Sequence, residues 1–380
     1  MNALVIGAGM MGSALAYDLA HSEGVDRVML ADINGDRARK IAASIGGKVE
    51  PVQLDTQVPE QVTRAMKGVS VAIGATSYTQ NLGLTQAAIT AGIHFCDLGG
   101  NMDVVDRQIA LDPLAKAAGV CILPNCGLAP GFASVVAAGG AKRFSALDEI
   151  HIRVGGLPQQ PQPPLNYQLV FSAEGLINEY LEPAEIIRNG KQERVGSMLD
   201  LEELDFPPPF GKLEAFNTSG GTSTLTRMFD GKVKALDYKT IRYRGHCEKF
   251  RLLIDLGFAG AEPIVAGASI RTAREFFEEM LRRRLPSNGP DIVLMRVTIR
   301  GMAENRSQTL AYEMIDHYDD KLKMTSMMRT TAFPTSIIAQ MLSNGTVGAR
   351  GVLPPEQCVP LAPLLSELRK RNIVVNESLT

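Results

Sequence analysis

The sequence has no tryptophan, few cysteines and almost no net charge. The five cysteines are scattered and odd in number, without a C-x-x-C pair, which argues against a disulfide framework or a zinc site. Reduced thiols are typical of a cytoplasmic protein. A formal net charge of −2, from 39 basic and 41 acidic residues, gives no reason to expect a nucleic-acid or membrane partner.

Long apolar runs and several common catalytic motifs are also missing. No stretch approaches the ~18 apolar residues that a membrane-spanning helix needs. The chain enters a strand pattern at once, so we expect no signal peptide. It contains no P-loop, nucleophile elbow or H-E-x-x-H motif. Its 380 residues, 45% of them hydrophobic, predict about two domains with ordinary cores.

The strongest pattern lies in the first 32 residues. An apolar run at 3–6 leads into G-x-G-x-x-G, written here as Gly7-Ala8-Gly9-Met10-Met11-Gly12. A second apolar run, 28–31, follows and ends on Asp32, twenty residues beyond the last of these glycines. Strand, glycine turn, helix, strand and acid together form the complete dinucleotide-binding fingerprint.

Each part of the fingerprint has a physical role. Gly7 permits the tight turn, Gly9 lets a pyrophosphate approach the backbone, and Gly12 allows close packing of the helix on the sheet. The N–H groups that begin the helix then face the phosphates. Asp32 accepts hydrogen bonds from the adenosine ribose and favours NAD, although the basic residues between 37 and 40 soften the exclusion of NADP. The alternative is a glycine turn without a ligand.

Alternating strand and helix patterns predict a Rossmann-type, doubly wound parallel sheet over residues 1–128. The strands are expected at 3–6, 28–31, 48–54, 69–75, 94–98 and 120–124. The helices are expected near Met10 and at 35–45, 59–67, 81–91 and 103–118. Ligands bind such sheets at the carboxyl ends of the strands, so the residues that follow each strand are the candidates for chemistry.

The candidates at these strand ends have structural alternatives. Asp97 binds a substrate ammonium, acts as a base or merely caps the next helix. Tyr78 lies either near the nicotinamide ring or in the packing. Asp55 is placed to contact the adenine end. Further candidate cofactor contacts are Ala75, Thr76, Asp97 and Leu98.

Residues 129–344 predict a second, α+β domain for substrate binding and dimerisation, and residues 345–380 are expected to pack back on the first domain. The Asn189-Gly190 pair predicts a hairpin between 185–188 and 192–195. Strands are expected at 149–155, 237–246, 292–300, 309–316 and 323–329. Helices are expected at 130–143, 272–285, 336–343 and 361–371.

A polar segment stands out in the second region. If 237–246 is a strand, side chains of alternate residues share a face, and these are Tyr238, Thr240, Arg242, Arg244 and His246. Two arginines and a histidine on one face suit a cleft that binds a carboxylate. The same pattern suits a solvated edge strand or an ion network at a dimer interface.

Upstream, residues 218–224 form a turn rich in hydroxyl groups and glycine, beginning at Thr218. This turn either presents backbone N–H groups to an anion or forms a flexible connection.

Blocks along almost the whole chain resemble the saccharopine dehydrogenase-like NAD(P) enzymes, most closely those that oxidise the side-chain amine of lysine. The blocks are GAGMMG at 7–12, FCDLGG at 95–100, GLAPG at 127–131, VGGLP at 154–158, PPLNY at 163–167, VFSAEGLI at 170–177, EAFNTSGGTSTL at 214–225, KTIRYRGHCEK at 239–249 and RGVLPPE at 350–356. Saccharopine reductases usually carry an aspartate where this chain has Ala129, and this departure argues against saccharopine chemistry.

The resemblance implies oxidative deamination of the ε-amine of L-lysine with NAD or NADP as the cofactor, and a homodimer or larger homo-oligomer. Arg242 and Arg244 would hold the substrate carboxylate, with Thr218 and Gly99 as further substrate contacts. No metal is implied.

Four residues share the catalytic hypotheses. Asp97 would orient the amine, and His246 or Tyr78 would relay the proton, since a histidine near its ordinary pKa suits that task. Lys239 is a further candidate base if burial lowers its pKa. The rival functions are a related dehydrogenase that joins an amine to a carbonyl compound, as in saccharopine or carboxynorspermidine formation, and a non-catalytic NAD-binding sensor.

Overall fold

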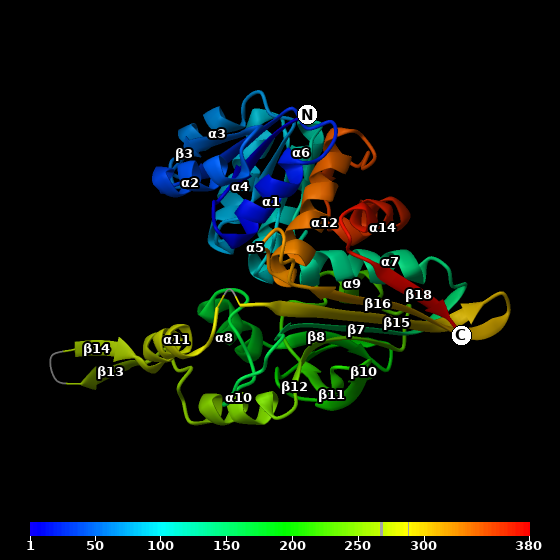
Figure 1. The fold of residues 1–380 in the computed structure, drawn as a ribbon. Helices are drawn as coiled ribbons and strands as arrows, with labels where there is room; N and C mark the ends of the chain where they lie inside the picture. Colours follow the sequence, from blue (N-terminus) through cyan, green and yellow to red (C-terminus); the bar gives the residue numbers. More distant parts are fainter. Residues whose placement is uncertain (267–268, 288) are drawn as a thin grey trace. The chain divides into compact units, whose positions relative to one another are not determined.

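The structure is a computed structural model that describes residues 1–266, 269–287 and 289–380 (Figure 1). The chain divides into two compact units. Unit 1 comprises Met1–Arg143, Ser223–Leu225 and Met328–Val374. Unit 2 comprises Phe144–Thr222, Thr226–Met327 and Val375–Thr380. The described helices include none that is long and apolar enough to cross a membrane.

Unit 1 is built on a seven-stranded parallel sheet in the order β17-β6-β5-β4-β1-β2-β3, which confirms the predicted Rossmann-type fold. The strands are β1 (Asn2–Ile6), β2 (Arg27–Asp32), β3 (Val49–Gln53), β4 (Val71–Gly74), β5 (His94–Asp97), β6 (Cys121–Leu123) and β17 (Gly351–Val352). Strand order reverses beside β1, which lies between β4 and β2. Ligand sites in such sheets form at this switch point.

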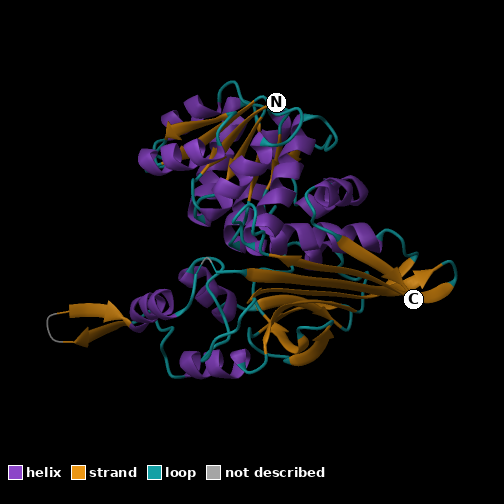
Figure 2. Cartoon of the chain, viewed as in Figure 1, coloured by secondary structure: helices purple, strands orange, loops and turns teal. Residues whose placement is uncertain are grey.

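Helices surround this sheet (Figure 2). They are α1 (Met10–Ala20), α2 (Gly35–Ile45), α3 (Pro59–Met66), α4 (Asn81–Ala91), α5 (Met102–Ile109), α6 (Asp112–Ala117), α7 (Ala133–Ala141), α12 (Ser326–Ser343), α13 (Pro355–Cys358) and α14 (Leu361–Lys370). Buried apolar residues of α3, α4 and α6 pack with the strands around Leu4, Phe95 and Ile122, none of which is exposed. Burial of these side chains holds the strand ends in register for the loops that follow them.

Two predicted helices of unit 1 have different limits. The helix expected at 103–118 is wrong as a single element, because α5 ends at Ile109 and α6 begins at Asp112. Pro113 lacks the N–H that a continuous helix would need there. The helix expected at 130–143 begins only at Ala133, because Ala129, Pro130 and Gly131 have non-helical backbone angles.

The C-terminal region completes unit 1. Strand β17 adds to the sheet beside β6, a strand that the sequence pattern did not predict. Directly after α14, Arg371 Nε donates to Asp18 Oδ1 of α1 at 2.6 Å. Helix α7 also belongs to unit 1, since a Cβ added to Gly139 would lie 2.6 Å from the Leu361 side chain. The division at 143/144 therefore lies beyond the predicted one at 128/129 by the segment 129–143, which contains this helix.

Unit 2 contains a nine-stranded mixed sheet, as expected for an α+β domain. The strands are β7 (Ala146–Pro158), β8 (Ala184–Arg188), β9 (Lys191–Val195), β10 (Glu202–Phe206), β11 (Gly211–Asn217), β12 (Ala235–Tyr243), β15 (Asp291–Ala303), β16 (Arg306–His317) and β18 (Val375–Leu379). Their main order is β10-β11-β12-β7-β15-β16-β18, with β8 paired to β12 and β9 to β8. Strands β12 and β7 are parallel, whereas the other pairs are antiparallel.

The remaining elements of unit 2 are short. The helices are α8 (Ala173–Leu181), α9 (Leu225–Met228), α10 (His246–Asp255) and α11 (Ala273–Arg284), and β13 (Pro263–Ala266) pairs with β14 (Ser269–Thr272) beside α11 (Figure 1). The predicted hairpin is confirmed, and both Asn189 and Gly190 have the positive φ that its turn requires. The predicted pairing of 292–300 with 309–316 is confirmed as well.

The strand predicted at 323–329 is wrong, because α12 begins at Ser326. The Asp291 carboxylate accepts hydrogen bonds from the N–H groups of Ser326 and Met327, the latter at 2.9 Å. A carboxylate in this position caps the helix. The capping residue is distant in the sequence, so a local pattern cannot reveal this helix start.

Candidate functional site

The turn after β1 provides the close backbone approach that a dinucleotide requires. Gly7 has a φ of 109°, and a Cβ at this position would lie 2.5 Å from the Ala75 carbonyl oxygen. A Cβ on Gly12 would lie 1.7 Å from the Gly7 oxygen, so α1 packs directly on the turn. A Cβ on Gly9 would meet nothing within 4 Å, which leaves open space beside this glycine. These contacts fit a bound pyrophosphate.

The start of α1 is suited to an anion. Its N-cap residue, Gly9, offers no side-chain acceptor, and its first turn carries no acidic residue. The N–H groups of the first helical residues, Met10, Met11 and Gly12, therefore point from the positive end of the helix towards the open side of the turn.

Asp32 is anchored at the end of β2. Its Oδ2 accepts a hydrogen bond from the Ala8 N–H at 2.8 Å, and its Oδ1 accepts one from the Asn34 N–H at 2.8 Å. The half-exposed guanidinium of Arg37 lies 3.8 Å from the same carboxylate. The acid expected to bind the ribose is thus fixed beside the glycine turn, with a cation next to it.

Other predicted cofactor residues follow the neighbouring strands. The Ala75 N–H donates to the Ile6 carbonyl at 2.8 Å, so this segment runs along the turn, and Thr76 follows it. Asp55 follows β3, and its Oδ1 accepts from the Gln57 N–H at 2.9 Å. The structure therefore places the predicted cofactor residues at the carboxyl ends of adjacent strands in unit 1.

Tyr78 and Gly99 lie in the loops that follow β4 and β5. Tyr78 is half-buried, and a Cβ on Gly100 would lie 3.1 Å from the Tyr78 Cβ. Gly99 has a φ of 78°, and a Cβ there would lie 2.0 Å from Asn125 Oδ1. The structure therefore gives Gly99 a conformational reason for being glycine, separate from its predicted contact with substrate. Leu98 is half-buried beside it.

Asp97 has no solvent exposure, and both of its oxygens are engaged. Oδ1 accepts from the N–H groups of Gly99 and Asn125 at 2.8 and 3.2 Å, and Oδ2 accepts from Gln108 Nε2 at 2.7 Å. Burial raises the pKa of this carboxyl to about 6. Asp97 thus ties the loop after β5 to the loop after β6, which favours a positioning role over the predicted direct contact with amine or cofactor.

The turn at 218–224 is held at both ends, which argues against a flexible connection. In unit 1, Ser223 Oγ accepts a hydrogen bond from Asn125 Nδ2 at 3.0 Å, and Thr224 Oγ1 donates to Glu356 at 2.5 Å. In unit 2, the Thr218 and Thr240 hydroxyl oxygens lie 2.7 Å apart. Thr218 is 2% exposed and belongs to the polar cluster on β12.

Strand β12 brings together only part of the predicted polar face. Tyr238, Thr240 and Arg242 alternate along it and are buried, as expected. The prediction that Arg244 and His246 share this face is wrong, because β12 ends at Tyr243. The chain then turns at residue 245, which has a φ of 82° that favours glycine.

Arg244 lies outside this cluster. Its side chain is 60% exposed and forms an ion pair with Glu203 at 2.7 Å. Arg242 is only 3% exposed, and its Nε donates to the Tyr180 hydroxyl at 2.8 Å while Nη1 donates to the Ile241 carbonyl at 2.9 Å. Its Cζ lies 4.8 Å from the centroid of the Tyr167 ring. Of the two predicted carboxylate-binding arginines, Arg242 is the one that is desolvated and oriented.

His246 begins α10 and is 1% exposed. Nδ1 lies 2.9 Å from the Leu165 carbonyl oxygen, and Nε2 lies 3.0 Å from the Tyr180 hydroxyl. Since a carbonyl only accepts, Nδ1 carries the hydrogen, and Nε2 accepts from Tyr180. Burial and the Arg242 charge lower the pKa of this imidazole to about 3. Both nitrogens are thus committed to hydrogen bonds, which argues against the predicted proton relay through His246.

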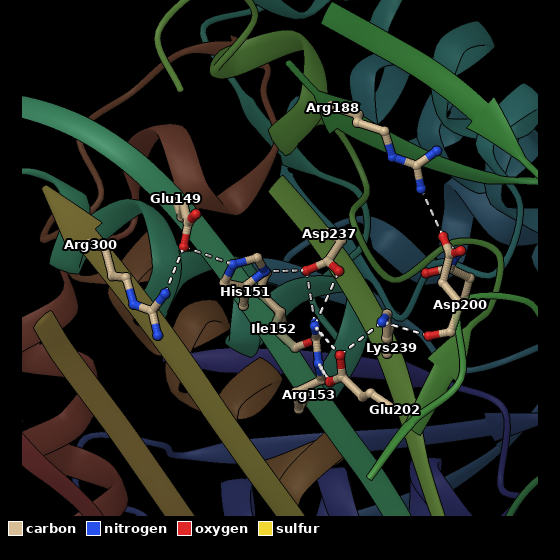
Figure 3. Close-up of polar contacts among 11 residues, drawn as sticks. Glu149, His151, Ile152, Arg153, Arg188, Asp200, Glu202, Asp237, Lys239 and Arg300 are labelled. Carbon is tan, nitrogen blue, oxygen red and sulfur yellow. Dashed lines mark hydrogen bonds and ion pairs between the residues drawn. The ribbon is translucent and has the colours of Figure 1, made fainter. Parts of the chain in front are cut away.

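Lys239 points to the opposite face of β12 from Arg242, because neighbouring strand residues alternate. Its ammonium donates to Glu202 Oε2 at 2.8 Å and to the Asp200 carbonyl at 2.6 Å. Figure 3 shows that Glu202 continues through Arg153 into a longer polar network. These contacts argue against the predicted role of Lys239 as a base, since its amine is an ion-pair partner buried among acceptors.

That network covers one face of the middle of the sheet (Figure 3). Asp237 accepts from Arg153 at 2.8 Å and lies 2.6 Å from His151 Nδ1. Contacts with His151 and Arg153 hold the pKa of the Asp237 carboxyl well below its usual range despite burial. Arg300 on β15 and Glu149 on β7 extend the chain of contacts at 2.9 Å. The members pair internally, which is typical of a structural network.

The sequence reasoning missed three residues of the Arg242 cluster, namely Tyr167, Glu179 and Tyr180. Tyr167 is 1% exposed, and Glu179 and Tyr180 lie in the last turn of α8. Glu179 Oε1 accepts from the Thr240 hydroxyl at 2.7 Å and lies 4.0 Å from Arg242 Nη2. Two sequence blocks of the resemblance, 163–167 and 170–177, contain or adjoin these residues and were the only available signal. In the described residues no cluster of side chains suits a metal ion.

The chain belongs to the saccharopine dehydrogenase family. Residues 3–123 match the saccharopine dehydrogenase NADP binding domain, and residues 127–374 match the saccharopine dehydrogenase C-terminal domain. The glycine turn and the parallel sheet lie within the first match. The match to an NADP binding domain supports a nicotinamide dinucleotide as the cofactor.

Two curated relatives illustrate the similarity. The chain is 21% identical to mitochondrial alpha-aminoadipic semialdehyde synthase of Mus musculus. The aligned region covers 99% of this chain but only 48% of the mouse protein. It thus spans about half the length of that relative. It is 20% identical to the NADP-dependent, L-glutamate-forming saccharopine dehydrogenase of Saccharomyces cerevisiae, over 97% of both chains.

Two solved structures share the fold. Apo saccharopine dehydrogenase from Saccharomyces cerevisiae has a TM-score of 0.82 at 18% identity and covers 100% of this chain and 99% of that one. Homospermidine synthase from Legionella pneumophila, in complex with NAD, has a TM-score of 0.71 at 14% identity, with 100% and 91% coverage. At these identities the likeness supports the fold.

The glycine turn yields a matched pair of variants. Gly9→Ala places its Cβ in open space at a φ of −79°, so we expect the unfolding midpoint to stay within about 1 °C while dinucleotide affinity falls about tenfold or more. Gly12→Ala forces its Cβ against the Gly7 oxygen, so we expect its unfolding midpoint to drop. Thermal unfolding and calorimetric titration with NAD⁺ and NADP⁺ measure both effects. A Gly9→Ala protein with normal affinity would contradict this placement of the pyrophosphate.

Asp97→Asn separates positioning from catalysis. A folded-state pKa of about 6, against an ordinary 3.8, means that the Asp97 contribution to stability falls as pH rises through this window, by about 3 kcal/mol in all. The asparagine does not ionise, and a flipped Gln108 amide can accept from it. Relative to wild type, the variant should gain stability between pH 4.5 and 7.5, measured by urea unfolding. Retention of kcat within about tenfold is expected for positioning, whereas a loss above about 10³-fold would indicate a catalytic base.

Proposed function

We propose that the protein is an L-lysine 6-dehydrogenase, which oxidatively deaminates the ε-amine of L-lysine with NAD or NADP as the oxidant. The ammonium loses a proton, a hydride leaves Cε, and water adds to the resulting imine so that ammonia is released. The product, 2-aminoadipate 6-semialdehyde, cyclises with loss of water to piperideine-6-carboxylate.

The observation that carries the proposal is the buried, oriented guanidinium of Arg242 in the family's C-terminal domain. A desolvated arginine whose Nε and Nη1 are fixed by Tyr180 and Ile241 is preorganised to bind a carboxylate. L-lysine carries its carboxylate at the end of the molecule remote from the reacting ε-amine, so this contact positions substrate without entering the chemistry.

Residues of unit 1 hold the cofactor in this scheme. The glycine turn and the first N–H groups of α1 bind the pyrophosphate, and Asp32 binds the adenosine ribose. The bound nicotinamide supplies the hydride acceptor. Asp97 holds the loops after β5 and β6 through Gly99 and Asn125. Tyr78, half-buried at the end of the β4 loop, is the predicted catalytic residue whose position is least constrained by such contacts.

The principal alternative is a dehydrogenase that reductively joins an amine to a carbonyl compound. Proteins named for such reactions, saccharopine dehydrogenase and homospermidine synthase, are among the relatives. Carboxynorspermidine synthase of Vibrio cholerae is another relative, at 22% identity over 95% of this chain. Against this alternative, Ala129 occupies the position before Pro-Gly at which saccharopine reductases usually carry an aspartate. Association as a homodimer and a cytoplasmic location stay predictions.

The decisive assay follows NADH or NADPH formation by the purified protein with L-lysine alone. Rapid reduction accompanied by ammonia release is the result we expect. Absence of reduction, together with NAD(P)H oxidation when an amine and a 2-oxo acid or aldehyde are supplied together, would replace the proposal with the amine-joining reaction. No turnover in either direction despite NAD binding would favour the sensor hypothesis.

The two arginines provide a second matched test. Arg242→Ala should raise KM for L-lysine by a factor of about 10 to 100, the size of a lost charge-assisted hydrogen bond, and leave KM for the dinucleotide unchanged. Arg244→Ala, which breaks an exposed pair with Glu203, should change KM for L-lysine by less than about twofold. Steady-state kinetics of both variants, with circular dichroism to verify folding, make the comparison. An equal effect of both would contradict the assignment of Arg242.

A further inference from the structure

We propose that Glu179 and Arg242 together form a binding site for the head group of an α-amino acid, with Glu179 taking the α-ammonium and Arg242 the α-carboxylate. This inference rests on the proposed function and deepens it. It assigns Glu179 a part in choosing the substrate, as a determinant of specificity that does not touch the reacting amine.

The geometry of the two charges carries the inference. Glu179 lies on α8 and Arg242 on β12, and Glu179 Oε1 lies 4.0 Å from Arg242 Nη2. This distance is too long for a hydrogen bond, so the two groups are neighbours without consuming each other's hydrogen-bonding capacity. The ammonium and carboxylate of an α-amino acid are bonded to one carbon. A negative and a positive side chain placed side by side match such a zwitterion.

The Arg242 guanidinium is oriented by a directional chain of hydrogen bonds. Arg242 Nε donates to the Tyr180 oxygen, Tyr180 donates to His246 Nε2, and His246 Nδ1 donates to the Leu165 carbonyl. Each group can act in only one direction once the carbonyl is fixed as an acceptor. Among the described residues, the guanidinium donates hydrogen bonds through Nε and Nη1. Nη2, the nitrogen that faces Glu179, keeps its donors for a ligand.

Glu179 is similarly prepared. Its Oε1 accepts from the Thr240 hydroxyl, and the Thr218 hydroxyl lies 2.7 Å from the same Thr240 oxygen. The side chain is 18% exposed, in contrast to the 3% of Arg242. A carboxylate fixed by one oxygen and partly open to solvent can take up an ammonium with its remaining lone pairs.

The competing explanation is that Glu179 only neutralises a buried arginine. Such an ion pair would support the fold equally for every substrate. A head-group site instead makes the effect of Glu179 depend on whether the substrate has an α-ammonium. Three amines separate the two explanations: L-lysine, 6-aminohexanoate, which lacks the α-ammonium, and 1,5-diaminopentane, which keeps that ammonium but lacks the carboxylate.

The experiment compares wild type with Glu179→Gln. The glutamine keeps the size of the side chain and an oxygen that accepts from Thr240. We expect the ratio of kcat/KM for L-lysine over 6-aminohexanoate to fall about 10- to 100-fold, since only L-lysine loses a charge-assisted contact. Glu174→Gln, an exposed residue in the first turn of the same helix, is the control and should leave the ratio unchanged. An unchanged ratio in Glu179→Gln, whether both values fall together or neither does, would overturn the proposal.

Calorimetric titration with L-lysine and 6-aminohexanoate in the presence of NAD⁺ gives an independent measure. The expected result is weaker binding of L-lysine, but not of 6-aminohexanoate, by Glu179→Gln. If Glu179→Gln shows this binding pattern but the wild-type protein does not oxidise L-lysine, the head-group site is supported and only the proposed reaction is overturned. If the wild-type protein oxidises L-lysine but Glu179→Gln binds both amines more weakly to the same extent, only the head-group site is overturned. The head-group site is also overturned if the wild-type protein does not bind L-lysine more tightly than 1,5-diaminopentane.

Discussion

The burial of the Arg242 charge is the constraint on which the polar cluster around this residue in unit 2 depends. A guanidinium removed from water costs several kcal/mol unless acceptors and aromatic faces replace its hydration. Tyr180 and Tyr167 supply these, and they come from the segment at 167–180, far from β12 in the sequence. His246 then completes the set by accepting from Tyr180. The contacts that offset the cost of burying this charge also fix the orientation of the guanidinium. The same contacts therefore stabilise the cluster and prepare it to bind a carboxylate.

The same logic applies to a carboxylate in unit 1. Asp97 has no exposure, and its two oxygens are occupied by N–H groups from two loops and by Gln108. A pKa of about 6 shows that these three contacts only partly offset the cost of burial. The protein therefore accepts some loss of stability near neutral pH to hold the loops after β5 and β6 together. Strain of this kind is common where strand ends must keep a fixed geometry for a ligand.

The sequence predicted unit 1 well because its signals are local. The G-x-G-x-x-G turn, Asp32 and the alternation of apolar runs all lie within short windows, and backbone sterics at Gly7 and Gly12 leave few alternatives. In unit 2 the hairpin at 189–190 was readable for the same reason. The roles predicted for Lys239 and His246 were not supported, because the alternation of side chains along a strand does not show which residues from other elements cover each face. The early end of β12 also placed Arg244 and His246 outside the strand, and the sequence signal for it was a single glycine.

Glu179 could not have been found from local pattern at all. It lies in the last turn of a short helix, and what sets it apart is the approach of Thr240 and Arg242 from a strand about sixty residues later. A partly exposed acid beside a buried, oriented base is an unusual combination, since a purely structural pair gains most when both partners are equally desolvated and directly bonded. Here the arginine has its own set of acceptors, and the glutamate is bonded to a threonine. Each charge is supported separately, which is the arrangement that leaves both available to a ligand carrying the two opposite charges.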